Sequence, residues 1–317
     1  MKEPDQNQRH SKANSQATQF AKFRLLCRPV AAVPAAAIAG IVLAGCEPDP
    51  VQVGTFDYSA ESLPAGTCKE GSRSGKPGIS DDEVSANGLN FSVRTPANYD
   101  ATIAHPMVMV YAPAGRSRFG TERMTGLTLA ATSAGYIISY ADHERISPST
   151  LPRMAEIPKQ VAANWCVDDQ RIYLTGHSDG GTAAMGLAFL EETRHLPRGI
   201  APSATGIRGS DLVEYSCPDP LSVLVMHSRE DSLFPGYGKE TVEWWAACNQ
   251  CSAEAKASGQ TGCQTYSDCA PGTRTWYCEG NGAHGKWPEI NSTILDFFAN
   301  SETPGSKTAQ PTPTASE

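Results

Sequence analysis

Two kinds of segment alternate along most of the chain. Short apolar runs rich in β-branched and aromatic residues are typical of strands, and the longer stretches between them have helical spacing. The expected strands span residues 89–93, 107–111, 136–140, 171–175 and 221–226. The expected helices span residues 124–133, 153–165, 182–190, 240–247 and 290–299. This alternation predicts an α/β fold, with a mostly parallel sheet covered by helices on both faces.

The amino-acid composition is that of a globular protein, and the net charge argues against nucleic acid as a partner. The chain has 317 residues, of which 40% are hydrophobic and 19% charged. That balance excludes a disordered or fibrous protein. With 26 basic and 34 acidic residues the net charge is −8. Because nucleic acid is itself negative, we expect no nucleic-acid partner.

The first 45 residues differ from the rest of the chain. They hold six basic and two acidic residues, and an apolar run over residues 30–44 follows the last basic residue. This run is shorter than the ~20 residues of a membrane-spanning helix. A basic leader before a short apolar core is typical of an export signal. The run ends in Leu43-Ala44-Gly45-Cys46, which resembles the bacterial lipobox, where cleavage precedes the cysteine and its thiol is acylated.

The lipobox resemblance implies an exported lipoprotein, held at a membrane by a lipid on Cys46, in the periplasm or at the cell surface. Residues 1–45 are then a signal peptide, 46–66 a tether, 67–300 the catalytic domain and 301–317 a disordered tail. An ordinary signal peptide with an incidental cysteine, or a membrane anchor, is the alternative.

Export changes the interpretation of the cysteines. Besides Cys27 in the leader and Cys46, eight remain: Cys68, Cys166, Cys217, Cys248, Cys251, Cys263, Cys269 and Cys278. An even number in an oxidising compartment favours up to four disulfides. Zinc is the alternative for the last five, but no histidine lies among them and no second CxxC completes a site. Since five cysteines cannot all pair with one another, at least one must bond to an earlier cysteine. The pairing stays open, and we expect no metal or organic cofactor.

Ser178 is the strongest candidate nucleophile. It lies in the sequence Gly-His-Ser-Asp-Gly, residues 176–180, between an expected strand and a helical segment. The G-x-S-x-G pattern is weak alone. Between a strand and a helix it is typical of the nucleophile elbow of α/β-hydrolases, a turn so tight that only small residues fit beside the serine. A glycine turn with an exposed serine is the alternative.

A nucleophilic serine needs a base and an acid, which in this fold follow it in the order acid, then histidine. Three histidines follow Ser178. We expect His195 at the surface, and His227 precedes every plausible acid on the next loop. His284, in a glycine-rich loop, is therefore the expected base. The acid is expected just after the last predicted strand, where Asp231 is favoured over Glu230.

Backbone N–H groups are expected to stabilise the oxyanion. One belongs to Asp179, directly after the nucleophile, and the other to the loop 112–115. Because Pro113 has no N–H, Ala114 or Gly115 must supply it. Residues 142–144, after another expected strand, are interpreted as a solvated loop.

Three segments together resemble the polyhydroxybutyrate depolymerase and feruloyl esterase-like family of secreted α/β-hydrolases. They are residues 166–181, 227–235 and 282–288. The resemblance covers most of residues 85–300. It implies the α/β-hydrolase fold, with Ser178 as nucleophile, Asp231 as acid and His284 as base.

The chain departs from that family at the oxyanion loop, where Ala-Pro stands in place of the usual His-Gly. The segment that carries the expected acid, residues 227–235 (here called the acid loop), begins His-Ser and not His-Gly. One extra residue separates His284 from Trp287. We expect Trp287 and His177 in the substrate site. Trp287 would stack on an aromatic or sugar ring, or alternatively only anchor its loop.

The expected function is that of an exported serine esterase that cleaves carboxylic esters through an acyl-enzyme. Acetyl or feruloyl esters on plant-derived oligosaccharides are favoured, because no surface-binding domain of the polyester depolymerase type follows the tail. Hydroxybutyrate oligoesters are the alternative substrate. The alternative function is a catalytically silent surface lipoprotein that binds a carbohydrate or a partner on a hydrolase scaffold, as the altered oxyanion loop suggests.

Overall fold

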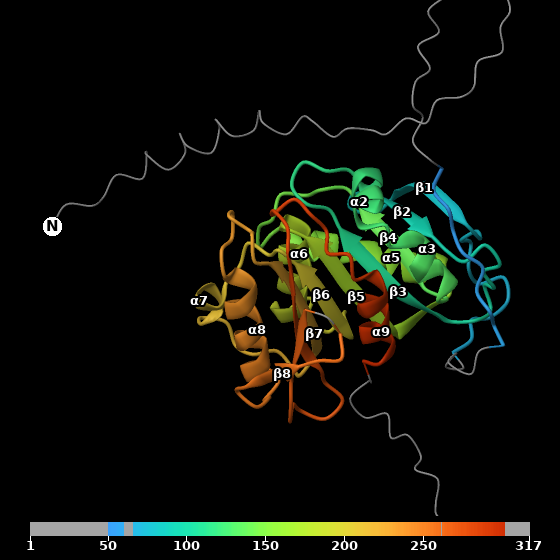
Figure 1. Cartoon of the computed structure of the whole chain (residues 1–317). Coiled ribbons are helices and arrows are strands. Elements are labelled where there is room, and N and C mark those ends of the chain that lie inside the picture. The colour runs from blue at the N-terminus through green and yellow to red at the C-terminus, as the bar shows by residue number, and fades with distance from the viewer. Residues whose placement is uncertain (1–49, 60–65, 261, 302–317) are drawn as a thin grey trace, which may run out of the picture. The chain divides into compact units, whose positions relative to one another are not determined.

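The structure, a computed structural model, describes residues 50–59, 66–260 and 262–301 (Figure 1). The expected signal peptide, the lipid site Cys46 and the expected tail after residue 301 lie outside the described residues. From Val51 onward the described residues form one compact unit. Among these residues no helix combines the length and the apolar character needed to cross a membrane.

A ten-stranded sheet runs through this unit in the order β1-β2-β4-β3-β5-β6-β7-β10-β9-β8. Its six central strands are parallel, and an antiparallel pair closes each edge. The strands are β1 (Ile79–Val84), β2 (Asn90–Arg94), β3 (His105–Tyr111), β4 (Ile137–Ala141), β5 (Val167–His177), β6 (Gly199–Ser203), β7 (Ser222–Ser228), β8 (Ala255–Ala257), β9 (Cys263–Tyr266) and β10 (Thr275–Gly280).

Helices cover both faces of the sheet. They are α2 (Arg118–Thr125), α3 (Thr128–Ser133), α4 (Leu151–Met154), α5 (Glu156–Asn164), α6 (Asp179–Phe189), α7 (Gly209–Leu212), α8 (Tyr237–Cys248) and α9 (Asn291–Ala299). Alternate residues of β3 belong to two separate cores: Met107 and Met109 share one with residues of α5, α6 and α8, whereas Val108 and Val110 share the other with residues of α3 and α9. The predicted mostly parallel sheet with helices on both faces is therefore confirmed.

The strand predictions differ from the structure mainly at two kinds of position. The five predicted strands are present as β2, β3, β4, β5 and β7. The central strand β6 was not predicted, because Gly199 and Pro202 interrupt its apolar pattern and a proline is rare in a central strand. The edge strands β1 and β8 expose most of their residues, so they lack an apolar signal.

Two predicted helices are each divided in the structure. The stretch 124–133 contains the end of α2 and all of α3, because Gly126 adopts a left-handed φ of 59° and ends α2. The stretch 153–165 contains the end of α4 and all of α5.

The expected tether, residues 46–66, is partly wrong. Gly54 donates its N–H to Thr132 Oγ1 at 2.7 Å. Phe56 is only 8% exposed, and Phe56 and Tyr58 pack edge-to-face against the buried His105. These contacts attach residues 54–58 to the domain, so the folded part begins before residue 67.

All eight cysteines predicted to form disulfides do so. The pairs are Cys68–Cys166, Cys217–Cys248, Cys251–Cys269 and Cys263–Cys278. Cys248 and Cys251, which form the Cys-x-x-Cys sequence, belong to different pairs. Cys248 is bonded to the earlier Cys217, in agreement with the expectation that one of the last five cysteines bonds to an earlier one. No described cysteine is free.

We predict that breaking the bond between Cys68 and Cys166 destabilises the protein more than breaking the bond between Cys251 and Cys269. The first pair is separated by 98 residues and the second by 18, and a longer closed loop restricts the unfolded chain more strongly. Replacing both cysteines of the first pair by alanine is expected to lower the free energy of unfolding by about 2–5 kcal/mol, and the second by about 1 kcal/mol less. Urea unfolding without reductant measures both. An unchanged urea midpoint for the first double variant would contradict this prediction.

Candidate active site

Ser178 lies in a strained turn between β5 and α6. Its backbone has φ 56° and ψ −118°, a conformation that residues with a side chain rarely adopt. The glycines on either side are needed for space. A Cβ added at Gly180 would lie 2.0 Å from the carbonyl oxygen of Tyr111, and one at Gly176 would lie 2.5 Å from the carbonyl of Gly180. The local sequence thus allows a turn that presents Ser178 at the N-terminus of α6.

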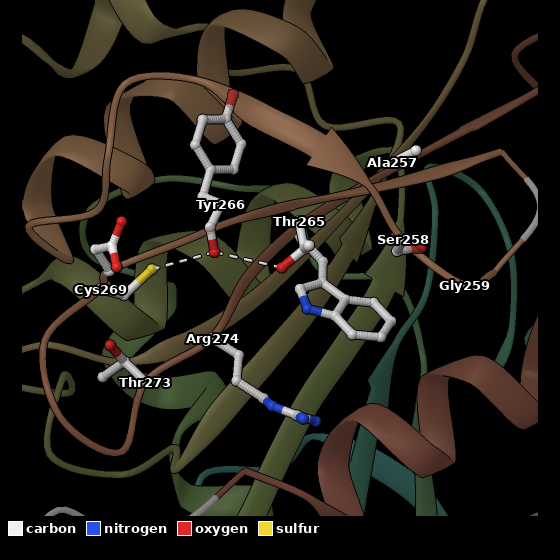
Figure 2. Close-up of a pocket in the computed structure, with 10 residues that line it drawn as sticks. Ala257, Ser258, Gly259, Thr265, Tyr266, Cys269, Thr273 and Arg274 are labelled. Atoms are coloured by element: carbon white, nitrogen blue, oxygen red, sulfur yellow. Dashed lines mark hydrogen bonds between the residues drawn. The ribbon is translucent and has the colours of Figure 1, made fainter.

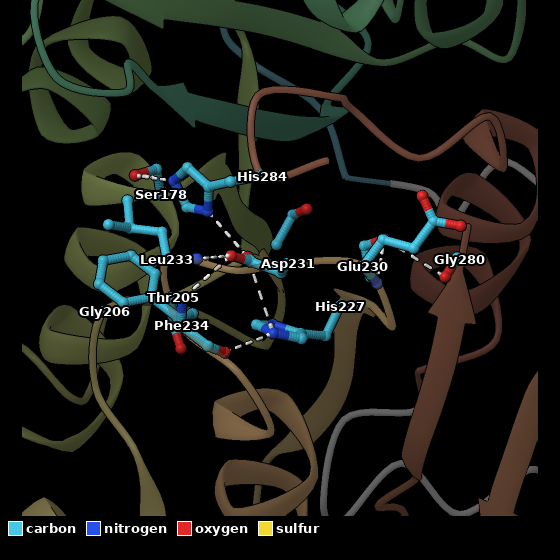
Figure 3. Close-up of polar contacts among 12 residues, drawn as sticks. Ser178, Thr205, Gly206, His227, Glu230, Asp231, Leu233, Phe234, Gly280 and His284 are labelled. Carbon is cyan, nitrogen blue, oxygen red and sulfur yellow. Dashed lines mark hydrogen bonds and ion pairs between the residues drawn. The ribbon is translucent and has the colours of Figure 1, made fainter. Parts of the chain in front are cut away.

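His284 connects Ser178 to a carboxylate (Figure 3). Its Nε2 lies 2.8 Å from Ser178 Oγ, and its Nδ1 lies 2.8 Å from Asp231 Oδ2. With Nδ1–H donating to Asp231, Nε2 is free to accept the hydroxyl proton. The geometry is that of a nucleophile, a general base and an orienting acid.

Asp231 is held as a carboxylate. It is 2% exposed, and its Oδ1 accepts the backbone N–H groups of Leu233 and Phe234 at 2.9 and 3.0 Å. Burial acts to raise the pKa of Asp231, but the hydrogen bonds from His284 and from these two N–H groups outweigh it, so the pKa lies below its usual value. The other candidate acid, Glu230, is exposed and makes no hydrogen bond to His284.

His227 supports the acid loop, a role that the sequence did not indicate. Burial lowers its pKa, which keeps the ring neutral, and Nε2 donates to the carbonyl oxygen of Phe234 at 2.9 Å. Its Nε2 also lies 3.7 Å from Asp231 Oδ2. His227 therefore packs behind the carboxylate and is not an alternative base.

The structure does not place His177 and Trp287 in an accessible substrate site. His177 is 2% exposed, and burial lowers its pKa to about 4. Its neutral ring donates from Nε2 to the carbonyl oxygen of His284 at 2.5 Å and accepts at Nδ1 from Ser203 Oγ at 3.0 Å. Trp287 is 8% exposed and donates its indole N–H to Asn291 Oδ1. His177 therefore binds the backbone of the loop that carries His284, and Trp287 connects the end of this loop to the first residue of α9. The anchoring alternative for Trp287 fits these contacts.

The expected oxyanion donors belong to two segments, the start of α6 and the loop after β3. Asp179 begins α6, so its N–H has no partner within the helix. Ala114 and Gly115 are exposed on a turn that the Arg116 N–H closes onto the Pro113 carbonyl oxygen at 3.1 Å. This turn directly follows β3, which pairs with β5 up to Tyr111 and Gly176.

Residues 142–144 are not simply a solvated loop. Asp142 accepts the N–H and a guanidinium N–H of Arg118, at 2.7 and 2.9 Å. His143 Nε2 lies 2.9 Å from Oδ2 of Asp179, the residue after Ser178. The position of these residues after β4 was the available signal, because β4 is the neighbour of β3 in the sheet.

Ser178, Asp231 and His284 are separate from a cavity of about 500 Å³ near the amino end of β10 (Figure 2). The cavity is lined by Ala257, Ser258, Gly259, Thr265, Tyr266, Asp268, Cys269, Thr273, Arg274 and Trp276. Asp231 and His284, in contrast, follow the carboxyl ends of β7 and β10.

Within the described ranges, no cluster of three or more histidine, cysteine, aspartate or glutamate residues is suited to a metal ion.

Comparison with known proteins identifies the fold. No protein-family model matches the chain, and no curated protein matches its sequence. Among solved structures it is similar to an acetyl xylan esterase from Aspergillus awamori, with a TM-score of 0.55 and 13% identity over 71% of this chain and 100% of that one. A truncated carbohydrate esterase from gut microbiota has a TM-score of 0.50 and 12% identity over 74% and 99% of the two chains. A thermostable esterase has a TM-score of 0.50 and 14% identity over 69% and 61%. The chain therefore has the α/β-hydrolase fold.

We predict that Asp231→Asn greatly slows reaction of Ser178 with a fluorophosphonate, whereas Glu230→Gln leaves the rate unchanged. An asparagine cannot hold His284 in the tautomer that accepts the serine proton, and a loss of about 10³-fold or more is expected. Glu230 is the matched control, because it is the neighbouring acid and points away from His284 (Figure 3). The rate of fluorophosphonate labelling is measured for each variant, and thermal unfolding checks that each variant is folded. Equal rates for the two variants would refute the assignment of Asp231.

Proposed function

We propose that the protein is an exported serine esterase that hydrolyses carboxylic esters. The observation that carries this proposal is the hydrogen-bonded chain from Ser178 through His284 to the buried Asp231, at a strained elbow. The three similar structures of TM-score 0.50 or more described above carry esterase names, which supports the reaction class.

In the proposed reaction, Ser178 Oγ attacks the ester carbonyl carbon while His284 Nε2 takes its proton. The N–H of Asp179 and that of Ala114 or Gly115 bind the negatively charged oxygen of the tetrahedral intermediate. His284 then gives the proton to the leaving alcohol, and an acyl-enzyme forms on Ser178. Water, activated by His284, releases the acid and restores the serine.

Acetyl or feruloyl esters on saccharides are the proposed substrates. The names of the first two similar structures, an acetyl xylan esterase and a carbohydrate esterase, support this choice. Leu233 follows the triad acid by two residues and is 59% exposed, so it offers apolar surface beside the triad for an acyl group. Hydroxybutyrate oligoesters are the competing substrate class.

We predict that Ser178→Ala abolishes both fluorophosphonate labelling and hydrolysis, with hydrolysis reduced by at least about 10³-fold. Initial rates on acetyl, butyryl, feruloyl and hydroxybutyrate-oligomer esters rank the substrates. The control is Ser210→Ala, an exposed serine in α7. A wild-type protein that is folded but neither labels nor cleaves any ester would instead favour the silent binding protein. A higher rate on the hydroxybutyrate oligomer than on acetylated or feruloylated saccharides would overturn the proposed substrate class alone.

Export and lipid attachment are also proposed. The lipobox-like sequence ending at Cys46 and the four disulfides, which form in oxidising compartments, support them.

We predict that Cys46→Ser moves the protein from the membrane fraction to the soluble exported fraction of a bacterial host, because acylation needs the cysteine thiol. Incorporation of labelled palmitate into the wild type, and its absence from the variant, measures the modification. The ten-cysteine chain offers Cys27→Ser as the control, which should keep the label. Palmitate incorporation into the Cys46→Ser variant would contradict the assignment. So would the absence of palmitate from the wild type.

A further inference from the structure

A second histidine–aspartate contact lies at the elbow and takes no part in the triad. His143 Nε2 is 2.9 Å from Asp179 Oδ2, and the two side chains are 23% and 38% exposed. Asp179 is the residue that offers its N–H to the oxyanion under the proposed function. The contact therefore involves the side chain of a residue whose backbone is expected to act in catalysis.

The contact crosses the loop that supplies the second oxyanion donor. In the sheet, β3 lies between β4 and β5, with Val110 level with Tyr140 on one side and with Thr175 on the other. His143 follows β4 and Asp179 follows β5, whereas the loop 112–117 leaves the end of β3 between them. The two side chains consequently connect the segments on both sides of this loop.

Other hydrogen bonds fasten the same loop to the segment that carries His143. The His143 N–H donates to the carbonyl oxygen of Arg116 at 3.1 Å. Asp142 accepts the backbone N–H and one guanidinium N–H of Arg118. The loop is thus attached to residues 142–143, and residue 143 is attached to the first residue of α6.

The charge of Asp179 gives the contact a second consequence. In the proposed reaction the N–H of Asp179 binds the oxyanion, so the side-chain carboxylate of the same residue adds a like charge to this region, and like charges repel. A histidine that donates a hydrogen bond to the carboxylate reduces this repulsion.

We propose that His143 is a positioning residue that, through Asp179, braces the oxyanion-binding loop against the elbow and offsets the Asp179 charge. This inference rests on the proposed esterase function. It also explains how the Ala-Pro loop, which lacks the His-Gly of the similar family, is kept in place.

We predict that His143→Ala lowers kcat by about tenfold to a hundredfold with KM changed by less than about threefold, because only the stabilisation of the transition state is weakened. His143→Gln, whose amide can still donate to Asp179, should stay within about threefold of the wild type. The inhibition constant for a phenylboronic acid, which forms a tetrahedral adduct with a nucleophilic serine, should rise in parallel with the loss of kcat/KM. Rates are normalised to the fluorophosphonate-reactive fraction, and His195→Ala serves as the control for loss of an exposed histidine.

A double-mutant cycle tests whether the contact itself is responsible. His143→Ala and Asp179→Ala each remove the same contact, so the double variant should lose no more than about threefold beyond His143→Ala. If His143→Ala does not fold, His143→Leu compared with His143→Gln decides in its place, with the Gln variant expected to be more active.

Three results would overturn the proposal. They are a His143→Ala variant with unchanged kcat and boronic acid affinity, a loss that lies in KM alone, and losses that add fully in the double variant. An inactive wild type would instead refute the esterase function itself. An active wild type with equal activity in all His143 variants would refute only the brace.

Discussion

The close approach of three backbone segments at the elbow is the constraint on which the site depends. Ser178 keeps its left-handed backbone because its N–H donates to the Ser203 carbonyl oxygen at 2.9 Å, and because Gly180 lies against the Tyr111 carbonyl. Such a conformation costs about 1–3 kcal/mol. The buried strands β3, β5 and β6 hold both sides of the turn, so the fold outweighs that cost. A side chain at Gly180 or Gly181 would separate these segments and remove the turn.

The same edge of the sheet brings the other members of the site to the serine. Asp231 and His284 follow β7 and β10, which pair in parallel up to Ser228 and Gly280 at their carboxyl ends. A disulfide lies near the segment that carries His284: Cys278, on β10, is bonded to Cys263 on the neighbouring strand β9. This covalent bond, together with the pairing of β7 and β10, limits the movement of the strand that leads to His284. Preorganisation of this kind is what a proton relay requires.

Sequence reasoning predicted the parts of this protein that have a short-range signal. The strand–Gly-His-Ser-Asp-Gly–helix pattern predicted the elbow, and the order of acid and histidine led to Asp231 and His284. Short-range patterns do not show whether a side chain near the site is buried, or which distant residue it contacts. His177 and Trp287 were expected in the substrate site, yet both side chains are buried. His143 was missed because its partner Asp179 is 36 residues away and is brought close only by the strand order β4-β3-β5.

Four histidines at this edge are distinguished by their burial and their partners. His177 and His227 are buried, their pKa values are lowered, and each donates from a neutral ring to a backbone carbonyl oxygen. His284 and His143 are more exposed, and each faces a carboxylate. Burial of an imidazole ring favours its neutral form. The site therefore supports its loops with neutral histidines and keeps the histidine–carboxylate pairs for positions where the proposed reaction moves or develops charge.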